Sequence, residues 1–81
     1  MADYATLVGE SATLRQKARM KEAECAALRG ALEDLLLSPA ADVGDIDRDK
    51  MLDVASGLHI ALGELATLRY KLSILDRALG K

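Results

Sequence analysis

A seven-residue apolar repeat in the second half of the chain constrains the fold more than any other feature. From residue 51 onward, both seam positions of every heptad are apolar. The seam residues are Met51, Val54, Leu58, Ala61, Leu65, Leu68, Leu72, Leu75 and Leu79. An uninterrupted seam of this kind is typical of an α-helix that packs along a second helix. We therefore expect one long helix over residues 48–79.

A weaker seam of the same period runs through the first half of the chain. Its members are Leu7, Ser11, Leu14, Ala18, Lys21, Cys25, Leu28, Leu32 and Leu35, so two of them are polar. We expect this helix to span residues 4–37, because Asp3 is suited to cap its start. Ser38-Pro39 should end it, since proline disfavours a helical conformation at the residue before it.

The linker over residues 38–47 is short, which makes the two helices antiparallel neighbours. Gly44 permits a turn there, and Asp45 or Asp47 can cap the second helix. A fold-back centred on Val43 places Leu28 opposite Leu58, and it pairs every seam residue of the first helix with one of the second. The same register fails if the chain shifts by one residue.

Composition supports an all-α fold with a thin aliphatic core. Hydrophobic residues make up 51% of the 81 residues but aromatic residues only 2%, so Leu and Ala dominate. A chain of this length is expected to form one domain, covering residues 1–81. We predict an all-α antiparallel two-helix hairpin, coiled-coil-like, that assembles into a four-helix bundle or a higher symmetric oligomer.

Charge and cysteine content point to a cytoplasmic protein. The net charge of −2 predicts no general attraction to nucleic acid or to membranes, and a single cysteine allows no internal disulfide. The first ten residues lack a charged leader followed by an apolar run, so we expect no signal peptide. No uninterrupted apolar run reaches the roughly 18 residues of a spanning helix.

The second helix carries another apolar stripe, roughly 160° around the helix from its seam. It consists of Ser56, Ile60, Gly63, Thr67, Tyr70 and Ile74. A helix with apolar residues on opposite sides is usually covered on both, and Gly63 would let another backbone approach closely. We predict an oligomer or partner interface at Ile60, Gly63, Thr67, Tyr70 and Ile74. The alternative is an ordinary surface with scattered isoleucines and one tolerated glycine.

The sequence contains no recognisable catalytic, metal or cofactor-binding group. His59 follows a seam residue and should face solvent, while Cys25 lies on the seam as a small buried thiol. Asp45, Asp47 and Asp49 resemble the start of a calcium loop, but Lys50 and Ser56 occupy the positions where that loop needs Gly and Glu. We therefore expect a non-enzymatic protein without a cofactor.

Arginines gather on one flank of the predicted hairpin. The register brings Arg15 beside Arg69, with Arg19 one turn away, and three such guanidinium groups suit an anionic ligand. Asp76 near Arg15 and Glu22 after Arg19 offer the alternative, in which the cations are neutralised within the hairpin. Nucleic acid is a less suitable partner, because the basic patch is small.

The segment of residues 24–36, Glu-Cys-Ala-Ala-Leu-Arg-Gly-Ala-Leu-Glu-Asp-Leu-Leu, resembles helices of small coiled-coil proteins encoded by phages and prophages. The resemblance implies no particular activity and transfers no site residues. It favours a small regulator or inhibitor that binds a host component. We thus expect an oligomeric helical adaptor or inhibitor of another protein; the alternative is a binder that sequesters a nucleotide-type anion in arginine-lined pockets.

Overall fold

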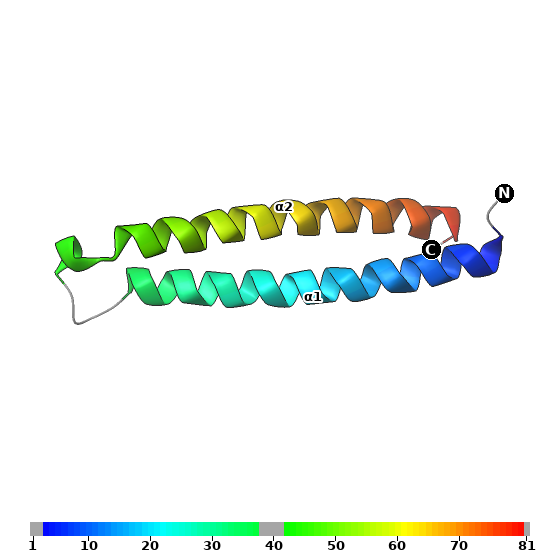
Figure 1. Cartoon of the computed structure of the whole chain (residues 1–81). Helices are drawn as coiled ribbons and strands as arrows, with labels where there is room; N and C mark the ends of the chain where they lie inside the picture. Colours follow the sequence, from blue (N-terminus) through cyan, green and yellow to red (C-terminus); the bar gives the residue numbers. More distant parts are fainter. Residues whose placement is uncertain (1–2, 38–41, 81) are drawn as a thin grey trace.

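The computed structural model describes residues 3–37 and 42–80. Helix α1 spans Tyr4–Leu36, a short 3-10 helix η1 spans Val43–Asp45, and helix α2 spans Arg48–Ala78. The two long helices run antiparallel side by side, so that the start of α1 and the end of α2 lie together (Figure 1). The structure therefore confirms the predicted all-α helical hairpin. The predicted helix stop at Ser38-Pro39 lies outside the described residues.

The helix ends are held by the capping groups that the sequence predicts. The side chain of Asp3 accepts the backbone N–H of Thr6 at 2.8 Å, and this hydrogen bond lowers the pKa of the carboxyl group. Asp47, rather than Asp45, caps α2 by accepting the N–H of Lys50 at 3.0 Å. At the other end, Gly80 has φ +78, a conformation that glycine adopts without a Cβ penalty.

The core is a single row of small and aliphatic side chains between the two helices. Its buried apolar members are Ala18, Cys25, Ala61 and Leu65, against which Leu28, Leu58 and Leu68 pack. Each of these residues belongs to one of the two predicted seams. The predicted register also holds near the turn, where a Cβ added to Gly57 would lie 3.7 Å from a methyl group of Leu28.

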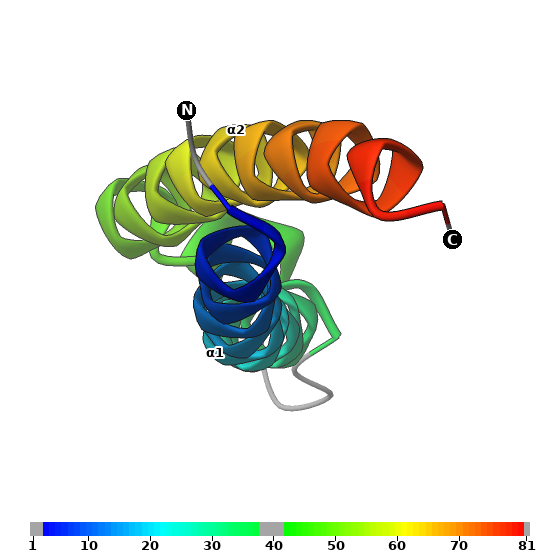
Figure 2. The ribbon, with the colours of Figure 1, turned by 90° about the vertical axis from the view of Figure 1, so that its right-hand side faces the viewer.

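The molecule is a thin rod with an unusually large surface. Its extents are 60 × 16 × 15 Å and its radius of gyration is 18.0 Å, against about 12 Å for a compact domain of this length. Its accessible surface is 6048 Å², whereas a compact monomer of this mass exposes roughly 4,700 Å². Viewed end-on, α2 lies across α1 in a single layer, which leaves the outer sides of both helices uncovered (Figure 2).

We predict that Gly57→Ala raises the free energy of unfolding by about 1 kcal/mol, because alanine avoids the entropic cost of a helical glycine. The new methyl group would meet the Leu28 side chain at ordinary contact distance. Urea unfolding followed by circular dichroism measures the change. Ala23→Gly, at an exposed position of α1, is the matched control and should lower stability by a similar amount. A loss of stability in Gly57→Ala would mean that the helices lie closer together at this point than the structure has them.

Candidate interaction surface

Helix α2 presents its second apolar stripe to solvent, on the side away from α1. Ile60, Tyr70 and Ile74 are 60%, 68% and 48% exposed, and Gly63 and Thr67 between them are also exposed. Every residue predicted for the oligomer or partner interface is thus accessible in the hairpin. We call this surface the outer stripe of α2.

The centre of the outer stripe carries its smallest side chains. Nothing lies within 4 Å of a Cβ added at Gly63. One turn later, Thr67 donates its hydroxyl to the carbonyl of Gly63 at 3.1 Å, so this side chain is already satisfied and turned back onto its own helix. The centre therefore offers small, hydrogen-bonded groups between two large apolar side chains, Ile60 and Tyr70.

Further apolar residues, which the sequence pattern did not predict to be exposed, are accessible in the structure. Leu52 is 64% exposed on α2. It lies four residues before Ser56, a helical spacing that places it on the same side of α2 as the outer stripe. Other exposed side chains lie at the turn of the hairpin, where Leu36, Leu37 and Val43 are 49%, 74% and 81% exposed. The exposure of these residues could not be predicted from the apolar repeat, because the repeat breaks down near the turn.

The arginines of the predicted anion site are engaged by carboxylates of the opposite helix. The Nη2 atom of Arg15 lies 3.1 Å from Oδ1 of Asp76, and the Nη2 atom of Arg69 lies 3.1 Å from Oε1 of Glu22. Arg19 is exposed on α1. Arg15 and Arg69 share no hydrogen-bond partner, so the structure holds them in two separate ion pairs rather than in one cationic pocket.

Ser11, a polar interruption of the first seam, is bonded into one of these pairs. It is only 2% exposed, and its Oγ donates to Oδ1 of Asp76 at 3.2 Å while accepting from Arg15 at 3.2 Å. A buried hydroxyl that both donates and accepts costs little, because its hydrogen-bonding capacity is used. This three-residue group ties the start of α1 to the end of α2.

Lys21, the other polar seam residue, joins two glutamates. Its Nζ lies 2.7 Å from Glu24 on the same helix and 2.6 Å from Glu64 on α2. Both hydrogen bonds, with the one to Glu24 the larger effect, raise the pKa of the ammonium group. A raised pKa means that the protonated form favours folding below the ordinary lysine pKa, and that this contribution is lost as pH rises through the folded-state value.

The two residues considered for nucleophilic chemistry differ in their exposure to solvent. Cys25 is 7% exposed in the core, while His59 lies on the exposed surface of α2, and a reactive thiolate needs exposure and a neighbouring base. Within residues 3–37 and 42–80, no group of three His, Cys, Asp or Glu side chains is placed to hold a metal ion.

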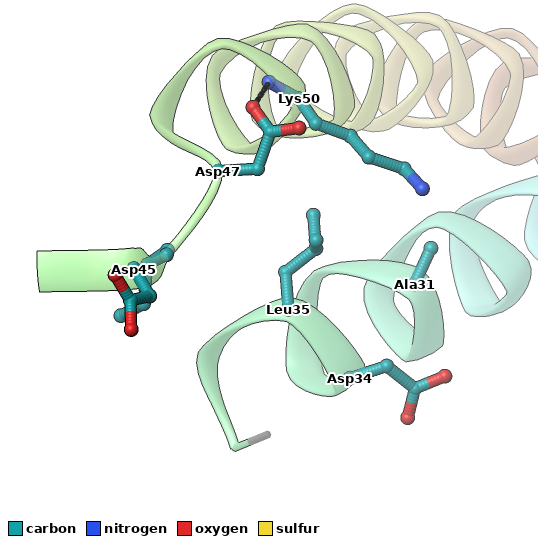
Figure 3. A pocket seen from close by; sticks show the side chains of 7 residues that line it. Ala31, Asp34, Leu35, Asp45, Asp47 and Lys50 are labelled. Atoms are coloured by element: carbon teal, nitrogen blue, oxygen red, sulfur yellow. Dashed lines mark hydrogen bonds between the residues drawn. The ribbon is translucent and has the colours of Figure 1, made fainter. Parts of the chain in front are cut away.

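The acidic run lies beside a hollow of ≈ 380 Å³ at the turn of the hairpin. Figure 3 shows that Asp47 points to the start of α2, where it caps Lys50, while Asp45 lies on the separate η1 segment. Leu35 of α1 points up toward α2 in the same view. The two carboxylates do not converge, so the calcium interpretation gains no support.

Helix α2 is long and apolar enough to cross a membrane, by length and composition alone. An 18-residue window within it has a mean hydropathy of 1.2, and 11% of that window is buried in the hairpin. Charged residues interrupt every apolar run in this helix, but Leu, Ile and Ala outweigh them in the average over the window. Lipid is therefore an alternative to a protein as the group that covers the exposed side of this helix.

Comparison with known proteins gives no relative: no family, no curated protein and no solved structure matches this chain. The candidate site must therefore be interpreted from its own geometry.

We predict that Asp76→Asn lowers the free energy of unfolding by about 0.5–1 kcal/mol, because it weakens a half-exposed ion pair and the hydrogen bond to Ser11. A double-mutant cycle with Arg15→Gln, measured by urea unfolding at low and high salt, isolates the pair. Lys71→Gln, at an exposed position of the same helix, is the control for loss of a charge. Additive effects of Arg15→Gln and Asp76→Asn would show that the two side chains are not coupled in solution.

Proposed function

We propose that this chain is a non-enzymatic, oligomeric helical binding protein that acts as an adaptor or inhibitor by docking another protein. The observation that carries the self-association in this proposal is the outer stripe of α2, on which Ile60, Tyr70 and Ile74 remain 48–68% exposed, while the partner protein would dock at the turn of the hairpin. A contiguous apolar strip on a soluble hairpin is typical of a protein–protein interface. The outer stripe is the element through which the hairpin associates.

The magnitude of the apolar surface supports association. Complete burial of a Leu, Ile or Phe side chain is worth about 1.5–3 kcal/mol, and the outer stripe has three large side chains that are 48–68% exposed. The hairpin itself buries four apolar residues among those described. Covering the outer stripe would therefore add to the apolar burial that the hairpin achieves alone, and a partner that binds the folded chain stabilises it.

The turn of the hairpin offers a second surface, as an adaptor requires. Leu36, Leu37 and Val43 are exposed there, close in sequence to exposed Asp42 and Asp45. Apolar side chains beside carboxylates suit a partner protein with a basic, partly apolar surface. The likeness to phage-encoded coiled-coil proteins adds to the case for an inhibitor of a host component, because such a protein needs only a docking surface.

The alternative, sequestration of a nucleotide-type anion by Arg15, Arg19 and Arg69, has less support. Arg15 and Arg69 already pair with carboxylates, and an anion would have to displace both. Thermal stabilisation by a panel of nucleotides, lost in Arg69→Ala, would favour this alternative.

We predict that the unmodified protein sediments as a multiple of 8.7 kDa at micromolar concentration, and that Ile60→Asp with Ile74→Asp converts it to monomer. Two buried carboxylates at an apolar interface are strongly unfavourable. Sedimentation equilibrium gives the mass. Met20→Asp is the matched control, since Met20 is an exposed apolar residue of α1 (64%) and its loss should leave the mass unchanged. A monomeric unmodified protein would contradict the oligomeric binding protein proposed here.

A further inference from the structure

We propose that the outer stripe of α2 is covered by the same stripe of a second copy, with the two α2 helices antiparallel about a two-fold axis near residue 65. This inference rests on the proposed function, because it specifies the surface and geometry of the self-association. In this arrangement Gly63 lies opposite the partner subunit's Thr67. The hairpin pair forms a four-helix assembly with the α2 helices in the middle.

The outer stripe is complementary to itself. A two-fold interface requires that if one residue contacts a second across the axis, the second also contacts the first. About residue 65 the stripe meets this condition from Ser56 to Ile74: Ile60 lies opposite the partner's Tyr70, and Ser56 lies opposite the partner's Ile74. The small pair of Gly63 and Thr67 falls at the axis, where crossing helices approach most closely, and the larger pairs fill the space on either side.

Charges at the ends of the stripe select the antiparallel arrangement. Asp53 and Arg77 continue the heptad spacing of the stripe, both are exposed, and neither has a salt bridge in the described hairpin. The two-fold that centres the apolar residues also places Asp53 opposite the partner's Arg77, twice per dimer. A parallel pairing would instead place like charges opposite each other at both ends, which is unfavourable.

The register is fixed by the same residues. A shift by one heptad in one direction would place Ile60 opposite the partner's Arg77 and leave Asp53 without an opposite residue. The shift in the other direction would place Asp53 opposite the partner's Tyr70. Beside the axis, the two copies bring their Glu64 side chains near each other. Each Glu64 is already bonded by Lys21 of its own hairpin at 2.6 Å, so the contact is between two ion pairs and not between bare carboxylates.

The available area is sufficient for a stable dimer. The hairpin exposes 6048 Å², roughly 1,300 Å² more than a compact chain of its mass. A standard stable interface buries about 800 Å² on each partner. From Asp53 to Arg77 the stripe extends about 36 Å along the helix at 1.5 Å per residue, well within the 60 Å rod. Burying one long face of each rod would therefore remove most of the surface that the hairpin exposes beyond that of a compact chain.

Cysteine crosslinking tests the arrangement directly in the full-length chain with Cys25→Ala. Ser56→Cys combined with Ile74→Cys should form disulfide-linked dimers on mild oxidation, because the two positions lie opposite across the axis. Within one chain they are about 27 Å apart along α2, so the disulfide must join two chains. Each single variant is the matched control and should remain uncrosslinked, whereas a parallel dimer would crosslink through either single cysteine.

Charge exchange tests the register without altering the apolar stripe. Asp53→Arg alone and Arg77→Asp alone should each raise the dimer dissociation constant about tenfold, because each change turns two attractive pairs repulsive. The double exchange should restore the dissociation constant of the unmodified protein. Absence of restoration would overturn the pairing of these two residues.

The outcomes separate the inference from the proposed function. An oligomer that forms no Ser56–Ile74 crosslink overturns the antiparallel α2 arrangement and leaves an oligomeric binding protein in place. A monomeric unmodified protein overturns both. Flotation with vesicles of phosphatidylcholine and phosphatidylglycerol, abolished by Ile60→Asp with Ile74→Asp, would identify lipid as the occupant and overturn the second copy.

Discussion

The packing of one helix seam against the other is the interaction on which the rest of the structure depends. Small residues such as Ala18, Cys25 and Ala61 line this seam and are buried, so the two backbones can approach closely while Leu65 and its neighbours fill the remaining space. The caps define where each helix begins and ends, but in a folded protein most of a helix's stability comes from the packing of its apolar face rather than from intrinsic propensity. Packing along the seam joins the two helices into one rod.

Because the core is only one side chain thick, the polar residues within the first seam help to select the register of the two helices. The group of Ser11, Arg15 and Asp76, and the pairing of Lys21 with Glu64, cross from α1 to α2 at different heights. Similar layers of leucine slide past each other at small cost, whereas a buried hydroxyl or a partly buried ammonium loses its partners on any shift. These polar contacts therefore favour one register over its neighbours, while the apolar contacts supply most of the stabilisation.

The two-helix architecture also bears on the proposed role, because it leaves one side of each helix uncovered. A two-helix rod covers one side of each helix, and α2 is apolar on two sides. Its inner seam is satisfied by α1, and its outer stripe is satisfied only by something outside the hairpin. In the proposed role, the specificity of self-association lies in the shape and charge of the stripe. Association and stability are then coupled, since a partner that covers the stripe also stabilises the hairpin.

The sequence alone determined the helices, their caps, the hairpin and its register, because these depend on local preferences and on a repeat of period seven that recurs in both halves. The exposure of the outer stripe, from Ile60 to Ile74, also followed from the sequence, because these positions lie on the side of α2 away from its seam. Only the tertiary structure decided which carboxylate each cation meets. Arg69 pairs with Glu22, and Lys21 joins Glu24 of its own helix to Glu64 of α2. Long side chains have several partners within reach of one register, and small differences in helix rotation and rotamer choose among them.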